Sequence, residues 1–198
     1  MKRSANPALT VAFLYFVSLA LVACYFIFRN NPQFDLDAEY NIPTYYESAL
    51  FLLAACAAFK NRGRRSSPNF GYWVFIGCAL LYAAIDEVAG IHEAITGLTS
   101  QMLHGAQLHN IWMLIYIPVM YFGVRALKGL WFDLKRTKPV CAWLMVAALL
   151  AWSLTFPAEL LVQWQVISDR YWHWEIAIEE FLEMNGSILL YAAFTLAR

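Results

Sequence analysis

Long apolar runs separated by short polar and basic segments dominate the chain. A membrane-spanning helix needs about 20 mostly apolar residues, and six segments meet that description. They are residues 8–28, 42–59, 72–93, 109–127, 140–162 and 172–197. The pattern therefore predicts an all-α fold: a polytopic integral membrane helix bundle with six transmembrane helices, in which residues 1–198 form a single transmembrane domain.

Composition supports this class. The chain has 198 residues, of which 61% are hydrophobic and only 14% are charged. Such a composition excludes a disordered chain and argues against an ordinary soluble domain. The stretch Leu21–Cys24 is similar to the end of a lipoprotein signal, but the apolar run continues to Phe28. We therefore expect this segment to be a first transmembrane helix rather than a removed signal.

The positions of Lys and Arg predict the topology. These residues are retained on the cytoplasmic side of a membrane. With the N-terminus inside and six helices threaded in turn, twelve of the fourteen basic residues fall on the inner side, and only Arg29 and Arg170 fall outside. Both termini are therefore expected to be cytoplasmic. The short basic loops suit a bacterial inner (plasma) membrane.

Carboxylates inside the apolar segments predict the functional region. A charged side chain at the bilayer centre costs at least ~2.5 kcal/mol, so such residues normally face the bundle interior and mark a functional site. A rise of ~1.5 Å per residue places them all in the outer half of the membrane. The loop acids Asp35, Asp37 and Glu39 are interpreted as ordinary acids of a translocated loop. The intramembrane acids are Glu47, Asp86, Glu87, Glu93, Glu179, Glu180 and Glu183.

The four histidines are predicted on the same side of the membrane as the acids. By this topology all four lie near the outer surface beside the acids, and Asp86 and Glu93, seven residues apart, share a helix face. Carboxylates and imidazole without thiolates suit Fe, Mn or Zn. Donors contributed by several helices resemble the layout of di-iron and di-manganese carboxylate proteins, although their repeated Glu-x-x-His motif is absent. The predicted metal ligands are Glu47, Asp86, Glu87, His92, Glu93, His109, Glu179, Glu180 and Glu183.

The leading functional hypothesis is a membrane enzyme with a non-haem metal site of one or two divalent ions, facing the periplasmic or outer side. It would be a di-metal oxidoreductase or a metal-dependent hydrolase acting on a lipid, quinone or other apolar substrate, with membrane lipids as its partners. Two alternatives remain open: translocation of a cation or proton, and a non-catalytic accessory subunit of a membrane complex. No phosphate-binding loop and no nucleic-acid surface are present in the sequence.

Overall fold

A computed structural model of the chain describes residues 6–63, 69–102, 111–163 and 171–198, without the side chains of residues 93, 96, 99–102, 111–116 and 156–163. All regular structure in the described residues is helical. The helices are α1 (Pro7–Ile27), a 3₁₀ turn η1 (Pro32–Phe34), α2 (Ile42–Asn61), α3 (Phe70–Ala89), α4 (Ile91–Met102), α5 (Ile111–Thr137), α6 (Pro139–Gln163) and α7 (Trp172–Leu196).

Three of these helices are long and apolar enough to cross a membrane. They are α1, α2 and α3, with mean hydropathies of 2.3, 1.3 and 1.5 in their most apolar windows. The apolar part of α6, Pro139–Thr155, is shorter. Within the described residues the chain is therefore an all-α bundle with three candidate spans, as expected of a membrane protein.

The predicted helix 72–93 is wrong at its outer end. The structure ends α3 at Ala89, and a separate helix, α4, begins at Ile91. The break is at Gly90, whose left-handed backbone (φ 56°, ψ 40°) closes α3 and favours glycine because other residues lose energy there. Asp86 and Glu93 therefore do not share one helix face.

The fifth α-helix also differs from the prediction, because it continues about three turns past the expected end at residue 127 to Thr137. It carries Lys128, Lys135 and Arg136 on this extension. Helix α6 then begins only two residues later.

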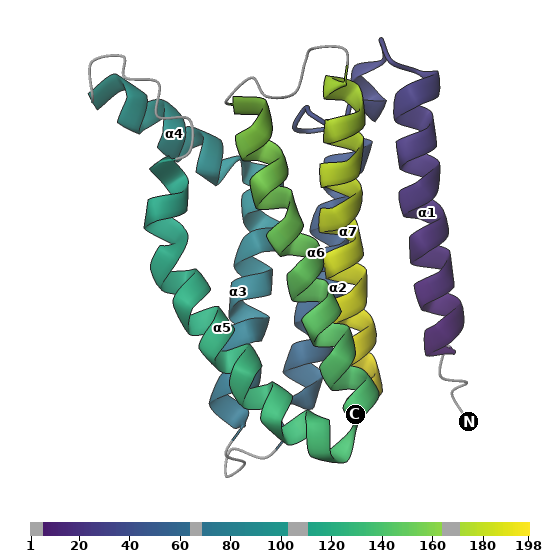
Figure 1. Cartoon of the computed structure of the whole chain (residues 1–198), viewed down its shortest axis with the longest axis vertical. Coiled ribbons are helices and arrows are strands. Elements are labelled where there is room, and N and C mark those ends of the chain that lie inside the picture. The colour runs from purple at the N-terminus through teal and green to yellow at the C-terminus, as the bar shows by residue number, and fades with distance from the viewer. Residues whose placement is uncertain (1–5, 64–68, 103–110, 164–170) are drawn as a thin grey trace.

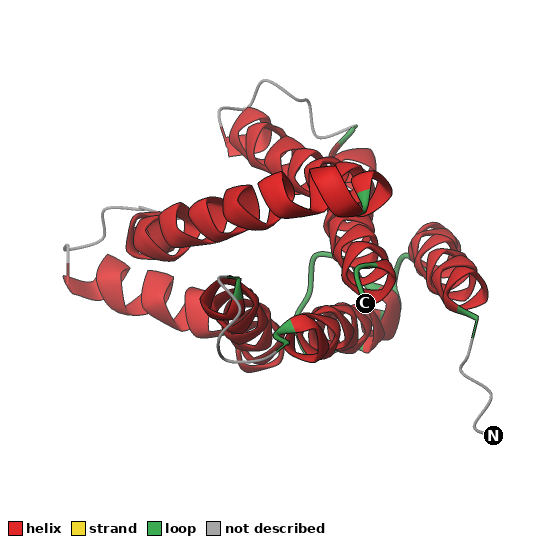
Figure 2. Cartoon of the chain, turned by 90° about the horizontal axis from the view of Figure 1, so that it is seen from below, coloured by secondary structure: helices red, strands yellow, loops and turns green. Residues whose placement is uncertain are grey.

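Helix α7 lies at the centre of the arrangement (Figure 1). It packs against α6, α2 and α1, while α3 packs against α2 and α5 lies against α6 and α3. Seen along the bundle, α1 and α5 lie on opposite sides of this group (Figure 2). The two termini lie at the same end, where Lys138 donates to the carbonyl of Leu196 at 3.1 Å. Helices α2 and α5 end here, α6 begins here, and the C-terminus lies here (Figure 1). We call this the basic end, because these helix ends and the C-terminus carry Lys60, Arg62, Lys135, Arg136, Lys138 and Arg198.

Close packing of small residues joins α2 to its neighbours in the basic half. Four alanines of α2 are at most 1% exposed, which lets neighbouring backbones approach closely without a hydrophobic driving force from water. Leu130, Met145 and Phe194 fill the space between α5, α6 and α7. A second apolar cluster joins α1 to α7 and α2 through Leu14, Leu21, Tyr25, Leu36, Leu50, Ile176, Ala177, Met184 and Ile188.

Polar contacts hold α1 in place. The Tyr15 hydroxyl donates to Oδ1 of Asn185 in α7 at 2.5 Å, and the Tyr46 hydroxyl of α2 donates to the carbonyl of Leu14 at 2.6 Å. Hydrogen bonds of this kind stabilise helix association in an apolar medium, where little else competes for the groups. Helix α1 is therefore fixed in rotation as well as in position.

Replacing Gly186 by Ala should lower the stability of the bundle. A Cβ at this position would lie 2.5 Å from Nε1 of Trp152, whereas a Cβ at Gly123 would meet nothing within 4 Å. Overpacking a tight contact costs about 1–3 kcal/mol. Thermal unfolding in detergent should show a lower midpoint for Gly186→Ala and an unchanged or higher midpoint for the control Gly123→Ala. Equal midpoints for the two variants would contradict the packing of α6 on α7.

Candidate functional site

Carboxylates from three helices interact near the end of the bundle opposite the basic end. Glu47 of α2 interacts electrostatically with Glu180 and Glu183 of α7 and with Glu87 of α3, and it shares a side-chain hydrogen bond with Glu180. Glu87 in turn interacts with Glu183. We call these four residues the carboxylate centre. The structure thus brings together acids from three helices that are far apart in sequence.

Glu47 is the most deeply buried member of the carboxylate centre. Its side chain is 2% exposed, and its Oε1 is buried without a hydrogen-bond partner among the described residues. Leaving a buried polar atom unsatisfied costs about 1–3 kcal/mol, and more when the group is charged. Two carboxylates also cannot hydrogen bond to each other without a proton between them. The Glu47–Glu180 contact therefore requires a proton or a cation.

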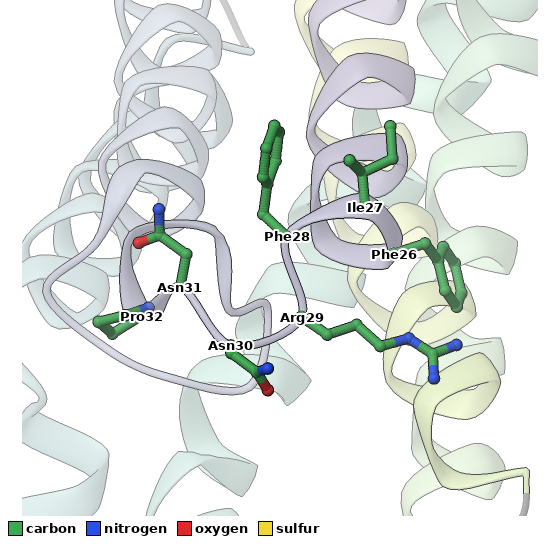
Figure 3. Close-up of a pocket in the computed structure, with 7 residues that line it drawn as sticks. All are labelled: Phe26, Ile27, Phe28, Arg29, Asn30, Asn31 and Pro32. Carbon is green, nitrogen blue, oxygen red and sulfur yellow. The ribbon is translucent and has the colours of Figure 1, made fainter.

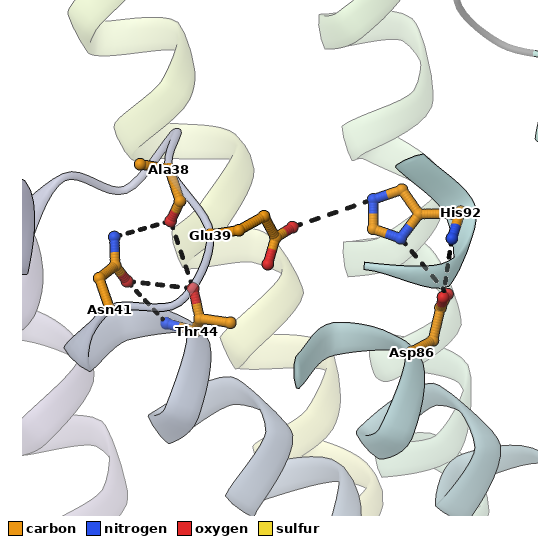
Figure 4. A network of polar contacts seen from close by, with 6 residues as sticks. All are labelled: Ala38, Glu39, Asn41, Thr44, Asp86 and His92. Carbon is orange, nitrogen blue, oxygen red and sulfur yellow. Dashed lines mark hydrogen bonds and ion pairs between the residues drawn. The ribbon is translucent and has the colours of Figure 1, made fainter. Parts of the chain in front are cut away.

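His92 forms a second part of the site at the corner between α3 and α4. Its backbone N–H donates to Oδ1 of Asp86 at 3.0 Å, and its Nδ1 lies 3.4 Å from Oδ2 of the same carboxylate. On its other side, Nε2 lies 4.0 Å from Oε1 of Glu39. Figure 4 shows the imidazole between these two acids. Asp86 thus both caps the first turn of α4 and orients the His92 ring.

The loop that carries Glu39 is tightly held. The Asn41 side chain is almost fully buried; its Nδ2 donates to the carbonyl of Ala38 at 2.7 Å, and its Oδ1 accepts from the backbone N–H of Thr44 at 3.1 Å (Figure 4). This second bond is an N-cap of α2. Between Glu39 and Asn41, Tyr40 has a left-handed backbone with φ of 61°, which is strained for a non-glycine residue. The loop is therefore built to place Glu39 against the α3–α4 corner.

Other predicted ligands lie apart from the carboxylate centre or outside the residues that the structure describes. Glu179 hydrogen bonds to Glu175 on its own helix. The side chain of Glu93 and all of His109 lie outside the described residues. Within the described part of the chain, no group of three His, Cys, Asp or Glu side chains is placed to hold a metal ion. His173 meets the Tyr25 hydroxyl through Nδ1 at 2.8 Å, and Tyr25 interacts with Asp35, Asp37 and Glu175.

Glu39 and Asp37 are the site residues that sequence reasoning missed. Both were interpreted as ordinary loop acids, yet Glu39 interacts with His92 and with Glu87, and Asp37 interacts electrostatically with Glu180. A signal was present in the sequence, because Asn41 followed by Pro43 and Thr44 is typical of a helix start. A residue just before the first turn of a spanning helix lies at the end of the bundle where that helix begins.

A separate hollow of about 500 Å³ lies at the end of α1, lined by residues 26–32. Figure 3 shows the side chains of Phe26 and Arg29 on the same side of this turn. The Arg29 guanidinium lies 5.7 Å from the centre of the Phe26 ring, and that ring packs on Trp174 at 4.6 Å. The hollow contains no carboxylate, so its chemistry is distinct from that of the carboxylate centre.

The comparisons with known proteins identify a family. The model of the domain of unknown function DUF8692 matches residues 8–197. The chain belongs to this family. Comparisons with curated proteins and with solved structures gave no match. The match includes every residue of the carboxylate centre, so the site lies within the family domain.

Replacing Asp37 by Asn should stabilise the protein more at high pH than at low pH. Asp37 is exposed on the surface, but partial desolvation by the surrounding loop, and secondly the charge of Asp35, raise its pKa above the ordinary value. The folded state therefore holds this proton more tightly than the unfolded state, and the wild type loses stability as the pH rises through the raised pKa. The difference in unfolding midpoint between Asp37→Asn and wild type should grow from pH 4 to pH 8. A difference that is constant or shrinks with pH would contradict this placement of Asp37.

Proposed function

We propose that this chain is a membrane-embedded metalloenzyme whose carboxylate and histidine side chains bind one or two divalent ions and act on an apolar substrate. In this proposal six helices span a bacterial inner membrane, both termini are cytoplasmic, and the site lies in the outer half of the bilayer. The reaction would be an oxidation or reduction by a di-metal centre, or a metal-dependent hydrolysis.

Two observations support the membrane arrangement. The described Lys and Arg residues at the bundle ends gather at the basic end, except Arg29 at the far end of α1, as the retention of basic residues in the cytoplasm predicts. The carboxylates of α7, which lower its hydropathy, include Glu180 and Glu183, and these two interact with acids of other helices. A helix whose charges face the bundle interior can cross a bilayer.

The single observation that carries the metal proposal is the environment of Glu47. A side chain that is 2% exposed, with an unsatisfied Oε1 and three further carboxylates interacting with it, requires a shared proton or a bound cation, and we propose the cation. An ion coordinated by these oxygens would satisfy the Oε1 atom and relieve the repulsion at the same time. We expect small side-chain rotations to bring Glu47, Glu87, Glu180 and Glu183 around the ion.

The corner at His92 would complete the site. Oδ2 of Asp86 lies 3.4 Å from Nδ1 of the His92 ring, and a carboxylate at this ring nitrogen is the kind of partner that orients metal-ligating histidines. Glu87, the neighbour of Asp86, reaches the carboxylate centre on one side and Glu39 on the other. His92 is therefore the proposed nitrogen ligand or proton-transfer group next to the bound ion.

The described acids favour this proposal over translocation. A proton or cation path would need ionisable groups along the whole bundle. In the described residues the carboxylates of α2, α3 and α7 all belong to the half opposite the basic end, and the apolar cluster around Leu130, Met145 and Phe194 fills the other half. A polar route that stops halfway suits chemistry at a fixed site.

Metal analysis of the purified protein tests the proposal. The wild type in detergent should contain about one or two Fe, Mn or Zn ions per chain, as expected for carboxylate sites in helix bundles. Glu47→Gln and Glu183→Gln each remove a charged ligand while keeping the shape of the side chain, so they should lose most of the metal. Asp133→Asn is the control, because its carboxylate lies at the opposite end beside Asn69.

Added metal should also raise the unfolding temperature of the stripped wild type, because an ion that binds only the folded state stabilises it. The same addition should leave Glu47→Gln unchanged. Protein that is free of metal as purified, and whose stability does not respond to Fe, Mn or Zn, would overturn the proposal. Metal that is retained equally by Glu47→Gln and Asp133→Asn would place the ion elsewhere.

A further inference from the structure

An apolar groove between α5 and α6 lies beside the carboxylate centre. It has a volume of about 480 Å³ and is lined by Met120, Gly123, Val124, Leu127, Leu149, Trp152 and Ser153. That volume is within the range of about 300–1,000 Å³ that small-molecule sites occupy. Five of the seven lining residues carry no polar side-chain group, and the Trp152 indole N–H and the Ser153 hydroxyl already donate to the backbone carbonyls of Glu183 and Leu149. The groove is therefore suited to hydrocarbon.

The groove exists because α5 and α6 separate. They pack together in the basic half through Ala126, Leu130 and Ala142 among others; beyond that point α5 leans away from α6 (Figure 1). Gly123 lies where the helices part, and a Cβ there would meet nothing within 4 Å. The space beside Gly123 is therefore open.

The inner wall of the groove connects it to the site. Trp152 lines the groove, and its Nε1 donates to the backbone carbonyl of Glu183 at 3.1 Å. Its ring also packs on Phe51 of α2 at 5.9 Å. One residue thus contacts both the groove and the backbone of a carboxylate-centre residue.

The position of the groove along the helices indicates its occupant. Gly123 and Trp152 each lie near the middle of their helices, and the rim residues Met120 and Val124 are 52% and 56% exposed. At mid-height of a spanning bundle, the medium in contact with such a rim is the acyl-chain region of the bilayer. A molecule that enters here comes sideways from the membrane.

Charge selects the head group. Trp152, the inner wall of the groove, bonds to the backbone of Glu183, so the interacting acids lie behind this wall, and the described Lys and Arg side chains do not line the groove. An anionic head group would be repelled by this region, whereas a hydroxyl or amine can donate hydrogen bonds to carboxylates or bind a metal ion. From this complementarity we infer that the α5–α6 groove binds the chain of a single-chain lipid alcohol or amine, with its head group toward the carboxylate centre.

This inference rests on the proposed function, since it names the class of substrate for that site. Its test uses photoreactive C16 probes that carry a diazirine in the chain and end in an alcohol, an amine or a carboxylate. The full-length protein in detergent is irradiated with each probe, and labelled peptides are identified by mass spectrometry. The alcohol and amine should label residues 120–127 and 149–153, and the carboxylate should label them much less.

Filling the groove provides the matched variant. Gly123→Leu should reduce labelling about tenfold, because its side chain displaces contacts worth roughly two methylene groups of the probe. Gly71→Leu is the control, since a Cβ at Gly71 also meets nothing within 4 Å but lies far from the groove, in the first turn of α3. Val124→Trp is a second blocking variant, and the unfolding midpoint of each variant shows that it is folded.

Labelling that persists in folded Gly123→Leu and Val124→Trp, or that spreads evenly over all apolar helices, would overturn the inference. Equal labelling by the carboxylate probe would also overturn it. The metal content of the same samples separates this result from the proposed function. Glu47-dependent metal binding together with unselective labelling would contradict only the groove. Selective labelling of metal-free protein would contradict only the metal site.

Discussion

The burial of carboxylates among apolar helices is the constraint on which this structure depends. Glu47 is almost completely enclosed, and its neighbours include Glu87, Glu180 and Glu183. Charged groups in such a medium repel one another strongly and attract any available cation, because little water is present to screen them. The helices that bear these residues must therefore hold them together against repulsion, and the rest of the fold shows how this is done.

The two halves of the bundle are stabilised by different interactions. In the basic half, buried alanines of α2 and the large side chains around Leu130 and Phe194 make a densely packed apolar core. In the other half, directed polar contacts replace part of that packing. The Ser48 hydroxyl donates to the carbonyl of Ala84 at 2.7 Å and ties α2 to α3, and Asn41 fixes the loop before α2. The carboxylate centre lowers the stability of its own half of the bundle, and the packed apolar core of the basic half offsets that loss.

Much of this arrangement could be predicted from the sequence. The helical class follows from apolar runs, and the meeting of Glu47 with Glu87 and Glu183 follows from threading those runs by their basic loops. The separate α4 was missed because the run of apolar residues continues through Gly90, and only its left-handed backbone reveals the break. The role of Glu39 was missed because helix periodicity says nothing about a loop. The Tyr25 partner of His173 was not predicted, because depth in the membrane does not specify which side chain lies opposite.

The division of α7 into two acidic pairs could not be read from spacing alone. Steps of four residues place Glu175, Glu179 and Glu183 on one face of a helix. In the structure Glu175 and Glu179 bond to each other, and Glu183 joins Glu180 in the carboxylate centre. Asp37 of the loop before α2 interacts with a member of each pair, Glu175 and Glu180, whereas Glu47 of α2 and Glu87 of α3 interact with the second pair.

The contact between α2 and α7 at Glu47 and Glu180 is the central claim, and a double-mutant cycle measures it directly. The free energy of unfolding is determined in detergent for wild type, Glu47→Gln, Glu180→Gln and the double variant. Groups in direct contact give interaction energies of about 0.5–3 kcal/mol, whereas distant groups add independently. The structure predicts an interaction energy in that range. Strict additivity of the two substitutions would contradict it.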